Sequence, residues 1–369
     1  MNDTVSLYIH IPFCVKKCAY CAFYSLPCND GEFFDAYTEA LLRRIESMPE
    51  LNIKTFYFGG GTPTVLGAKR LCKIIDKVAK TQKVDKNAEI TLEVNPKTVF
   101  SDDFPALRNA GFNRISIGLQ SADDDMLKML GRVHTFSDFL HCYNDAARCF
   151  SNITTDIIFA LPYDKEKGYS DKTLYGSLKA LTDLNIPHIS AYSLTLEEGT
   201  ALYKNKQSYS FPDENQEEGE YNMICQTLSE KGYRHYEVSS FAKPGYEAVH
   251  NTAYWKRESY IGIGPAAHSF YLNRRFSTLP DVRLFIENSS KPFLADTDFA
   301  LSYEITPQEA EEEKIMLCLR TSDGVYLEGE KLEKAKQLSS MGYGTVSNGV
   351  FSLNDRGFRV SNYIISMLI

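Results

Sequence analysis

The stretch SLYIHIPFCVKKCAYCAF, residues 6–23, places three cysteines directly after a run of apolar and β-branched residues. Cys14, Cys18 and Cys21 follow a C-x3-C-x2-C spacing. Because a loop this short can turn three sulfurs to one side, the spacing suits three corners of a cubane 4Fe-4S cluster. The next cysteine, Cys28, lies seven residues further on, so no fourth thiol follows at a ligating position. One iron is therefore expected to stay open for a bound molecule.

Two other interpretations of these cysteines remain open: a zinc ion with His10 as fourth ligand, or thiols without a metal. A second motif favours the cluster. Gly59-Gly60-Gly61-Thr62-Pro63 directly follows the predicted strand Thr55–Phe58. Residues without a Cβ let the backbone approach a ligand and donate hydrogen bonds to its polar head. Taken alone, the run also fits a tight turn; beside the cysteines it predicts a site for S-adenosylmethionine (SAM), held on the open iron by its amino and carboxylate groups.

Strand-like and helix-like segments alternate along the first two thirds of the chain. Amphipathic stretches such as Phe33–Met48 separate the strands. This alternation predicts an α/β fold with parallel strands and helices outside. Six units are too few for a closed eight-fold barrel, so we expect a partial (β/α) barrel, open along one side, with its functional residues at the carboxyl ends of the strands. The predicted strands are Ser6–Pro12, Thr55–Phe58, Glu89–Val94, Arg114–Gly118, Thr154–Phe159 and His188–Leu194.

Three parts are expected along the chain. Residues 1–235 form the partial barrel with the cluster and SAM site, and residues 236–300 form a connecting segment rich in aromatic residues and glycine. Residues 301–369 form a small helical, winged-helix-like domain. Its first helix is expected to begin at Thr306, with Glu309 completing a capping box.

Composition narrows the class of protein. A hydrophobic content of 43% is ordinary for a soluble globular chain, and a net charge of -8 makes nucleic acid an improbable partner. The N-terminus lacks a secretory signal, and no apolar run is long enough to span a membrane. Nine cysteines without disulfide-like spacing fit a reducing compartment. We therefore expect a cytoplasmic protein.

The remaining thiols and imidazoles follow no clear pattern. His268 fits either a cofactor-lining or a core position, and His235 fits a structural or surface position. Six cysteines are expected to be buried or idle: Cys28, Cys72, Cys142, Cys149, Cys225 and Cys318.

Several motifs, spread over nearly the whole chain, are similar to those of one family. They are IHIPFCVKKCAYCAF, FGGGTPT, EVNP, NRISIGLQS, DIIFALP and HISAYSLTLEEGT. Together they resemble the oxygen-independent coproporphyrinogen III oxidase superfamily of radical-SAM proteins. The resemblance implies a 4Fe-4S cluster, SAM and a radical-SAM barrel followed by a C-terminal domain.

The resemblance also implies which residues hold the cofactors. Tyr8 and Tyr20 would flank the cluster, and Arg132 of GRVH would pair with a carboxylate, in a bidentate geometry. From the residues alone, Gln120 also fits a turn cap, Arg132 a solvated surface cation and Tyr8 core packing. The positions that would contact the methionine part, the polar groups and the ribose of SAM are Gly60, Gly61, Thr62, Glu93, Gln120 and Asp156.

Two departures separate the chain from the oxidase proper. Phe23 stands where the oxidase motif continues to a further cysteine, and only thirteen residues precede Cys14, where oxidases carry a long N-terminal extension. Both departures match the heme chaperone subgroup. The run His250–Trp255 reads H-N-x-x-Y-W, which resembles the heme-binding signature of that subgroup. Imidazole is a normal axial ligand of heme iron, and Tyr254 and Trp255 would stack on a porphyrin. The alternative is a buried structural histidine bonded by Asn251.

The expected function is therefore that of a heme chaperone. It would bind a 4Fe-4S cluster, SAM and heme, receive electrons from a donor and pass heme to an acceptor protein. The alternative is an oxygen-independent coproporphyrinogen III oxidase, which decarboxylates two propionates in porphyrin biosynthesis. Radical chemistry on another substrate is a third possibility.

Overall fold

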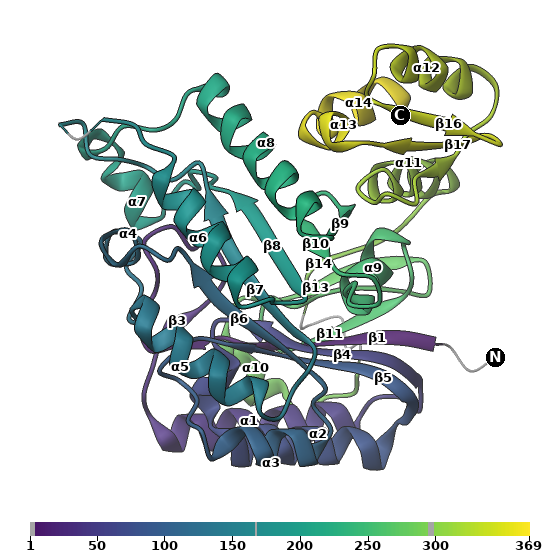
Figure 1. Cartoon of the computed structure of the whole chain (residues 1–369). Coiled ribbons are helices and arrows are strands. Elements are labelled where there is room, and N and C mark those ends of the chain that lie inside the picture. The colour runs from purple at the N-terminus through teal and green to yellow at the C-terminus, as the bar shows by residue number, and fades with distance from the viewer. Residues whose placement is uncertain (1–3, 167, 294–298) are drawn as a thin grey trace.

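The computed structural model describes residues 4–166, 168–293 and 299–369. A 12-stranded sheet organises this part of the chain, in the order β14-β13-β12-β11-β1-β4-β5-β6-β7-β8-β10-β9 (Figure 1). Seven neighbouring strands of this sheet pair in parallel, and six of them are the strands that the sequence predicts. The sheet does not close on itself, which confirms the open, partial barrel. The six strands are β1 (Thr4–Ile11), β4 (Asn52–Gly60), β5 (Lys83–Val94), β6 (Arg114–Gln120), β7 (Ile153–Phe159) and β8 (His188–Ser193).

Helices follow the parallel strands and cover the outer face of the sheet. In Figure 1, α1, α2 and α3 lie beneath β1, β4 and β5. Helix α1 shows why these segments fold as they do: the Asp30 side chain caps its first turn, and its inward face buries Tyr37, Leu41 and Ile45. The helices are α1 (Gly31–Glu46), α2 (Ala68–Thr81), α3 (Asp103–Ala110), α4 (Asp124–Met129), α5 (Phe136–Ala147), α6 (Lys172–Asp183), α7 (Ala201–Lys204) and α8 (Glu214–Glu230).

Short strands extend the sheet at both edges. β11 (Tyr260–Ile263) pairs in parallel with β1, and the strands beyond it are antiparallel. The predicted connecting segment, residues 236–300, thus supplies most of the edge strands, apart from residues 294–298, which lie outside the described residues. The other elements here are β9 (Arg234–Glu237), β10 (Ser240–Ala242), α9 (Val249–Trp255), β12 (His268–Tyr271), β13 (Arg274–Thr278), α10 (Val282–Asn288) and β14 (Phe299–Glu304).

The C-terminal residues pack around a core of their own. Leu319, Leu338, Phe351 and Ile364 are buried together in it. Helices combine with a three-stranded sheet in the order β15-β17-β16, an arrangement similar to the predicted winged helix. The capping box at Thr306 is present. The elements are α11 (Pro307–Cys318), β15 (Val325–Tyr326), α12 (Gly329–Ser340), β16 (Gly344–Ser347), β17 (Val350–Leu353), α13 (Asp355–Arg359) and α14 (Ser361–Leu368).

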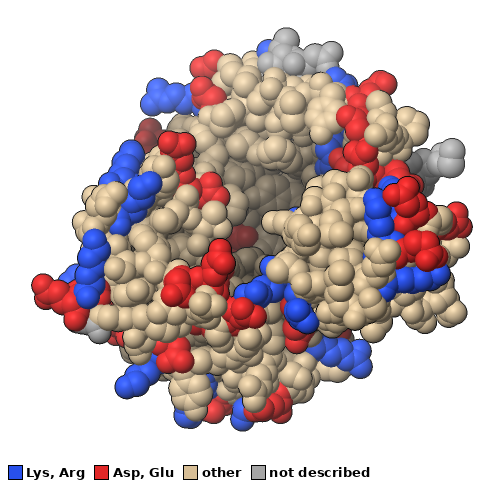
Figure 2. All heavy atoms as spheres, turned by 90° about the horizontal axis from the view of Figure 1, so that it is seen from above, with Lys and Arg blue, Asp and Glu red and all other residues tan. Residues whose placement is uncertain are grey.

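The face of the sheet opposite α1–α3 is open. Seen from above, the surface is deeply hollowed at its centre, and the visible walls of this hollow consist mostly of uncharged residues (Figure 2). Within the described ranges, no helix has both the length and the apolar character that crossing a membrane requires.

Candidate cofactor site

The three clustered cysteines lie in the loop that leaves the first strand. Cys14 ends β2 (Phe13–Cys14) and is buried, whereas Cys18 and Cys21 are half-buried. All three are free thiols. Burial raises the pKa of Cys14 and of Cys21, and the nearby Cys18 raises both further. The three thiols therefore lie close enough to influence one another's ionisation.

His10, the alternative zinc ligand, has no free ring nitrogen. Its Nε2 lies 3.0 Å from the carbonyl oxygen of Tyr24, which can only accept, so Nε2 must carry the proton. Its Nδ1 lies 3.0 Å from the Tyr8 hydroxyl, which then donates. Burial lowers the pKa of His10 to about 4, so the ring is neutral and both nitrogens are used. This geometry argues against the zinc interpretation.

The glycine run packs directly against the cysteine loop. Gly60 has φ +114, and a Cβ on Gly61 would lie 2.5 Å from the Phe13 carbonyl oxygen and 3.0 Å from the Cys14 sulfur. The Gly61 amide donates to the Ile11 carbonyl at 2.8 Å. Only residues without a side chain fit here, so the backbone itself lines the approach to Cys14.

A chain of hydrogen bonds joins two of the cysteines. Arg132 Nη1 lies 3.5 Å from Cys18 Sγ, and its Nη2 donates to the side-chain oxygen of Asn95. Asn95 Nδ2 donates to Thr62 Oγ1 at 2.6 Å, and Thr62 donates to Cys14 Sγ at 3.7 Å. Arg132 is therefore no solvated surface cation. The set of residues predicted to hold the cofactors omits Asn95, although it directly follows the strand Glu89–Val94.

Arg132 also contacts Tyr20 and the end of β6. Its side chain lies beside that of Tyr20, whose pKa is raised chiefly by burial. Its Nη2 donates to the Gly118 carbonyl at 2.8 Å. Gln120 ends the same strand with φ +73, a conformation that non-glycine residues seldom adopt. The structure thus places Tyr20, Arg132 and the β6 terminus around Cys18.

Two half-buried carboxyl groups, Glu93 and Asp156, lie on parallel strands of the barrel. Glu93 on β5 accepts a hydrogen bond from the Tyr57 hydroxyl at 2.8 Å, and Ser116 donates to Asp156 on β7 at 3.4 Å. Burial raises the pKa of Glu93 to about 7, and the charge of Asp156 contributes. Burial also raises the pKa of Asp156. A Cβ on Gly59 would lie 3.0 Å from Glu93 Oε1, so Glu93 adjoins the glycine run.

Tyr8 belongs to the same part of the barrel. Its ring stacks on Tyr57, with the centroids 6.2 Å apart, and burial raises its pKa well above the usual value. Tyr57, which sequence reasoning missed, connects Tyr8, Glu93 and the ring of His250, whose centroid lies 5.0 Å away. The signal for Tyr57 is its place on the strand that leads into the glycine run.

His250 is deeply buried in the first turn of α9. Thr55 Oγ1 lies 2.7 Å from its Nδ1, and the Tyr254 hydroxyl lies 2.8 Å from its Nε2. Burial lowers the pKa of His250 to about 3, so the ring is neutral. Its partners are thus Thr55 and Tyr254 rather than Asn251. Both ring nitrogens already have hydrogen-bond partners, as they would in a structural histidine.

Trp255, the other aromatic residue of the H-N-x-x-Y-W motif, also has a hydrogen-bond partner. Trp255 Nε1 donates to Glu237 at 2.5 Å. His268, by contrast, is exposed at the start of β12.

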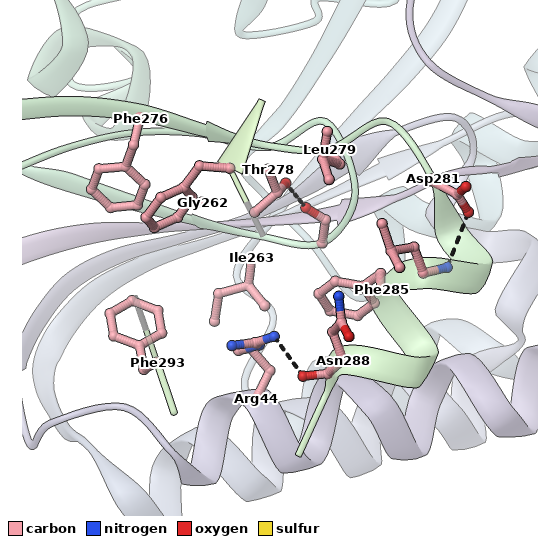
Figure 3. Close-up of a pocket in the computed structure, with 13 residues that line it drawn as sticks. Arg44, Gly262, Ile263, Phe276, Thr278, Leu279, Asp281, Phe285, Asn288 and Phe293 are labelled. Carbon is pink, nitrogen blue, oxygen red and sulfur yellow. Dashed lines mark hydrogen bonds between the residues drawn. The ribbon is translucent and has the colours of Figure 1, made fainter. Parts of the chain in front are cut away.

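A separate apolar pocket lies between α1, α10 and the strands β11, β13 and β14 (Figure 3). Ile263, Phe276 and Phe285 line it, and Arg44 donates to the Asn288 carbonyl at 3.0 Å beside it. Its volume of about 40 Å³ admits only a few water-sized groups, which excludes a porphyrin. None of the predicted site residues lines this pocket.

Comparison with known proteins identifies the family. The Radical SAM superfamily matches residues 8–170. The heme chaperone HemW of Lactococcus lactis is 34% identical over 331 residues, which cover 88% of this chain and 83% of that protein. HemW of Bacillus subtilis is 33% identical, covering 87% and 84%. HemW of Escherichia coli is 36% identical over 285 residues, covering 76% and 72%.

A solved structure extends the likeness in fold. Coproporphyrinogen III oxidase HemN from Escherichia coli superposes with a TM-score of 0.84, covering 100% of this chain and 90% of that one. Because only 19% of the residues are identical, this likeness establishes the architecture and no activity. The relatives of higher identity decide the membership: the chain belongs to the radical SAM superfamily and, within it, to the family of HemW heme chaperones.

Proposed function

We propose that this protein is a heme carrier that holds a 4Fe-4S cluster and SAM and passes heme to an acceptor protein. The observation that carries the proposal is the similarity to heme chaperones over 88% of the chain. The arrangement of the barrel rim supports the cofactor part, because the cysteine loop contacts both the glycine run and Arg132.

The cluster would be held by Cys14, Cys18 and Cys21. Arg132 would stabilise the negative charge of the Cys18 thiolate through its Nη1, while Thr62 donates to Cys14. When bound, such a cluster supplies electrons of low potential, which it would receive from a donor protein. Arg132 would thus neutralise charge at Cys18, and Thr62 would orient the Cys14 ligand.

SAM would lie between the glycine run and the two half-buried carboxyl groups. The backbone of Gly60 and Gly61 can approach its methionine part without steric obstruction, and Thr62 and Gln120 offer polar groups beside it. Glu93 and Asp156 would contact the cationic and hydroxyl groups of SAM. A positive ligand favours the ionised form of Glu93, so SAM would lower its pKa.

Heme would be bound through His250, and because this residue is only 1% exposed, the structure around it would have to open locally. Nε2 would exchange the Tyr254 hydroxyl for iron, while Thr55 keeps its contact with Nδ1 and so fixes the ring. Displacing Tyr254 would free a second aromatic ring to pack on the porphyrin. Loss of that hydrogen bond would cost about 0.5–1.5 kcal/mol, which an iron–imidazole bond can offset.

One anaerobic experiment separates the carrier from the coproporphyrinogen oxidase, the alternative that the sequence motifs leave open. The reconstituted protein is supplied with reductant, SAM and coproporphyrinogen, and protoporphyrinogen is measured. In parallel, heme is titrated and the Soret band is followed. The carrier proposal expects saturable heme binding without product. Product formation, or the lack of a heme spectrum, would contradict it.

A further inference from the structure

We propose that Cys225, His235 and Asp355 form a zinc site that joins the barrel to the C-terminal domain. The three residues come from α8, β9 and the start of α13, and one ligand atom from each lies within 4.8 Å of the others. His235 Nδ1 and Asp355 Oδ1 are 2.8 Å apart. In the part of the chain that the structure describes, no other group of three such side chains converges in this way.

The donor set suits zinc. Thiolate, imidazole and carboxylate are its usual protein ligands, with bonds of about 2.0–2.3 Å in a tetrahedron. Ligand atoms in such a tetrahedron are separated by roughly 3.3–3.8 Å, so the distances here need only small side-chain rotations. The Asp355 side chain is 54% exposed, which leaves room for water as the fourth ligand.

On the barrel side, the His235 side chain is already held in one orientation. The His235 side chain is only 7% exposed, and its ring stacks on Phe241 at 4.1 Å between centroids and packs against Phe358 at 4.8 Å. The ring therefore cannot turn freely. Its Nε2 is buried and has no hydrogen-bond partner among the described residues. An imidazole held in this way has already lost the rotational freedom that metal binding would otherwise remove.

The thiol of Cys225 is also buried, mainly in apolar surroundings. Burial, with a contribution from the charge of Asp355, raises the pKa of Cys225 to about 12. The thiol therefore keeps its proton in the absence of metal. Zinc would replace the thiol proton, while the His235 proton would move from Nδ1 to Nε2, so binding would release the Cys225 proton and weaken at low pH.

The location of these three ligands predicts how bound zinc would affect the contact between the barrel and the C-terminal domain. Tyr221 on α8 donates to the Asp355 carbonyl at 2.9 Å, and Arg359 pairs with Glu218 at 3.0 Å. Figure 1 shows the C-terminal helices beside α8 and above β9. A metal bound here would connect three elements across the junction, and it would hold the C-terminal domain against the barrel.

Zinc content measured on the full-length chain tests the proposal. Because free Cys14, Cys18 and Cys21 would themselves bind zinc, the protein is examined both with its cluster loaded and as the C14A/C18A/C21A variant. We expect one zinc per chain in both forms, retained against a weak chelator, and a higher melting temperature with zinc. The metal is counted by elemental analysis and its affinity is measured by competition with a chromophoric chelator.

Two substitutions and a control decide the ligands. Cys225→Ser should weaken zinc binding at least 100-fold, and Asp355→Asn should weaken it at least 10-fold. Both substitutions should abolish the rise in melting temperature that zinc causes. Cys142→Ser, at a buried thiol of α5 outside the site, should change neither. Circular dichroism verifies folding, and Asp355→Asn, at an exposed position, keeps the test valid if Cys225→Ser unfolds. Zinc absent from both protein forms, or equal affinity in the control and the folded site variants, would overturn the proposal.

Discussion

Arg132 Nη1 and Cys18 Sγ lie 3.5 Å apart, although 114 residues separate them in the sequence. The contact brings a permanent positive charge to a thiol of the cysteine loop. Through Asn95 and Thr62 the same side chain reaches Cys14. This chain of hydrogen bonds connects the segments that follow β4, β5 and α4, so the environment of the sulfurs depends on several loops of the barrel rim.

The first prediction concerns this arginine. Replacing Arg132 with Met should lower the reduction potential of the reconstituted cluster, because a cationic N–H donor stabilises the more negative, reduced form. We expect a shift on the order of 50 mV, roughly a tenfold change in the one-electron reduction equilibrium. Redox titration followed by EPR gives the value. Arg148→Met, at an exposed position, is the control and should leave the potential unchanged; equal potentials in both variants would contradict the assigned role.

A second prediction uses the glycine run. Gly61→Ala places a Cβ 2.5 Å from the Phe13 carbonyl and 3.0 Å from Cys14 Sγ, so the cysteine loop must move. We expect destabilisation of about 1–3 kcal/mol and a marked loss of iron after reconstitution. Gly176→Ala is the matched control, because its Cβ meets nothing within 4 Å in α6, and there alanine should be neutral or stabilising. Iron and sulfide content and chemical denaturation compare the two; full iron content in Gly61→Ala is the contrary outcome.

The raised pKa of Glu93 predicts that the stability of the cluster-free protein depends on pH. Its pKa rises from the ordinary 4.5 to about 7 on folding, so the folded state keeps a proton that the unfolded state has lost. Stability should therefore fall as the pH rises between these values, by about 3 kcal/mol. Glu93→Gln stays neutral and should gain stability relative to the wild type at pH 8 but not at pH 4.5. Thermal unfolding at both pH values measures the gap, with the exposed Glu230→Gln as control; a gap that does not change with pH would exclude the effect.

The heme prediction has a control within the same barrel. His188, like His250, is buried and bonded by a threonine and a tyrosine: Thr154 lies 2.5 Å from its Nδ1 and Tyr236 2.9 Å from its Nε2. His250→Ala and His188→Ala should both destabilise the protein by about 1–3 kcal/mol. Only His250→Ala should also reduce heme uptake, seen as a weaker Soret band. If both variants bind heme equally well, His250 is a structural histidine.

The sequence predicts the parallel part of the fold because its strands are long and regularly separated by amphipathic helices. β9 and β10, by contrast, have four and three residues, too few for a periodic pattern. At the antiparallel edge, β12 and β13 form a hairpin whose two turn residues, Leu272 and Asn273, have φ of +52 and +58, and a turn without glycine gives only a weak signal in the sequence. Predicted and observed strand ends also differ. β5 begins at Lys83 rather than Glu89, because the mostly polar residues between these two positions show no strand pattern.

At the site, the cysteines and glycines are predictable because close spacing or the lack of a Cβ constrains what they can do. Asn95 and Tyr57 are harder to predict, since an asparagine or tyrosine at a strand end fits many roles. The group Cys225, His235 and Asp355 is invisible in the sequence, because 120 residues separate the histidine from the aspartate. Partners of this kind emerge only when the fold brings their elements together.

The central claim is that three cysteines hold a 4Fe-4S cluster with one iron open to SAM, and EPR of the reduced, anaerobically reconstituted protein tests it most directly. The account predicts about four irons and four sulfides per chain and a cluster signal that changes when SAM is added. The C14A/C18A/C21A variant should show neither the iron nor the signal. Zinc in place of iron, or a signal that SAM leaves unchanged, would contradict the account.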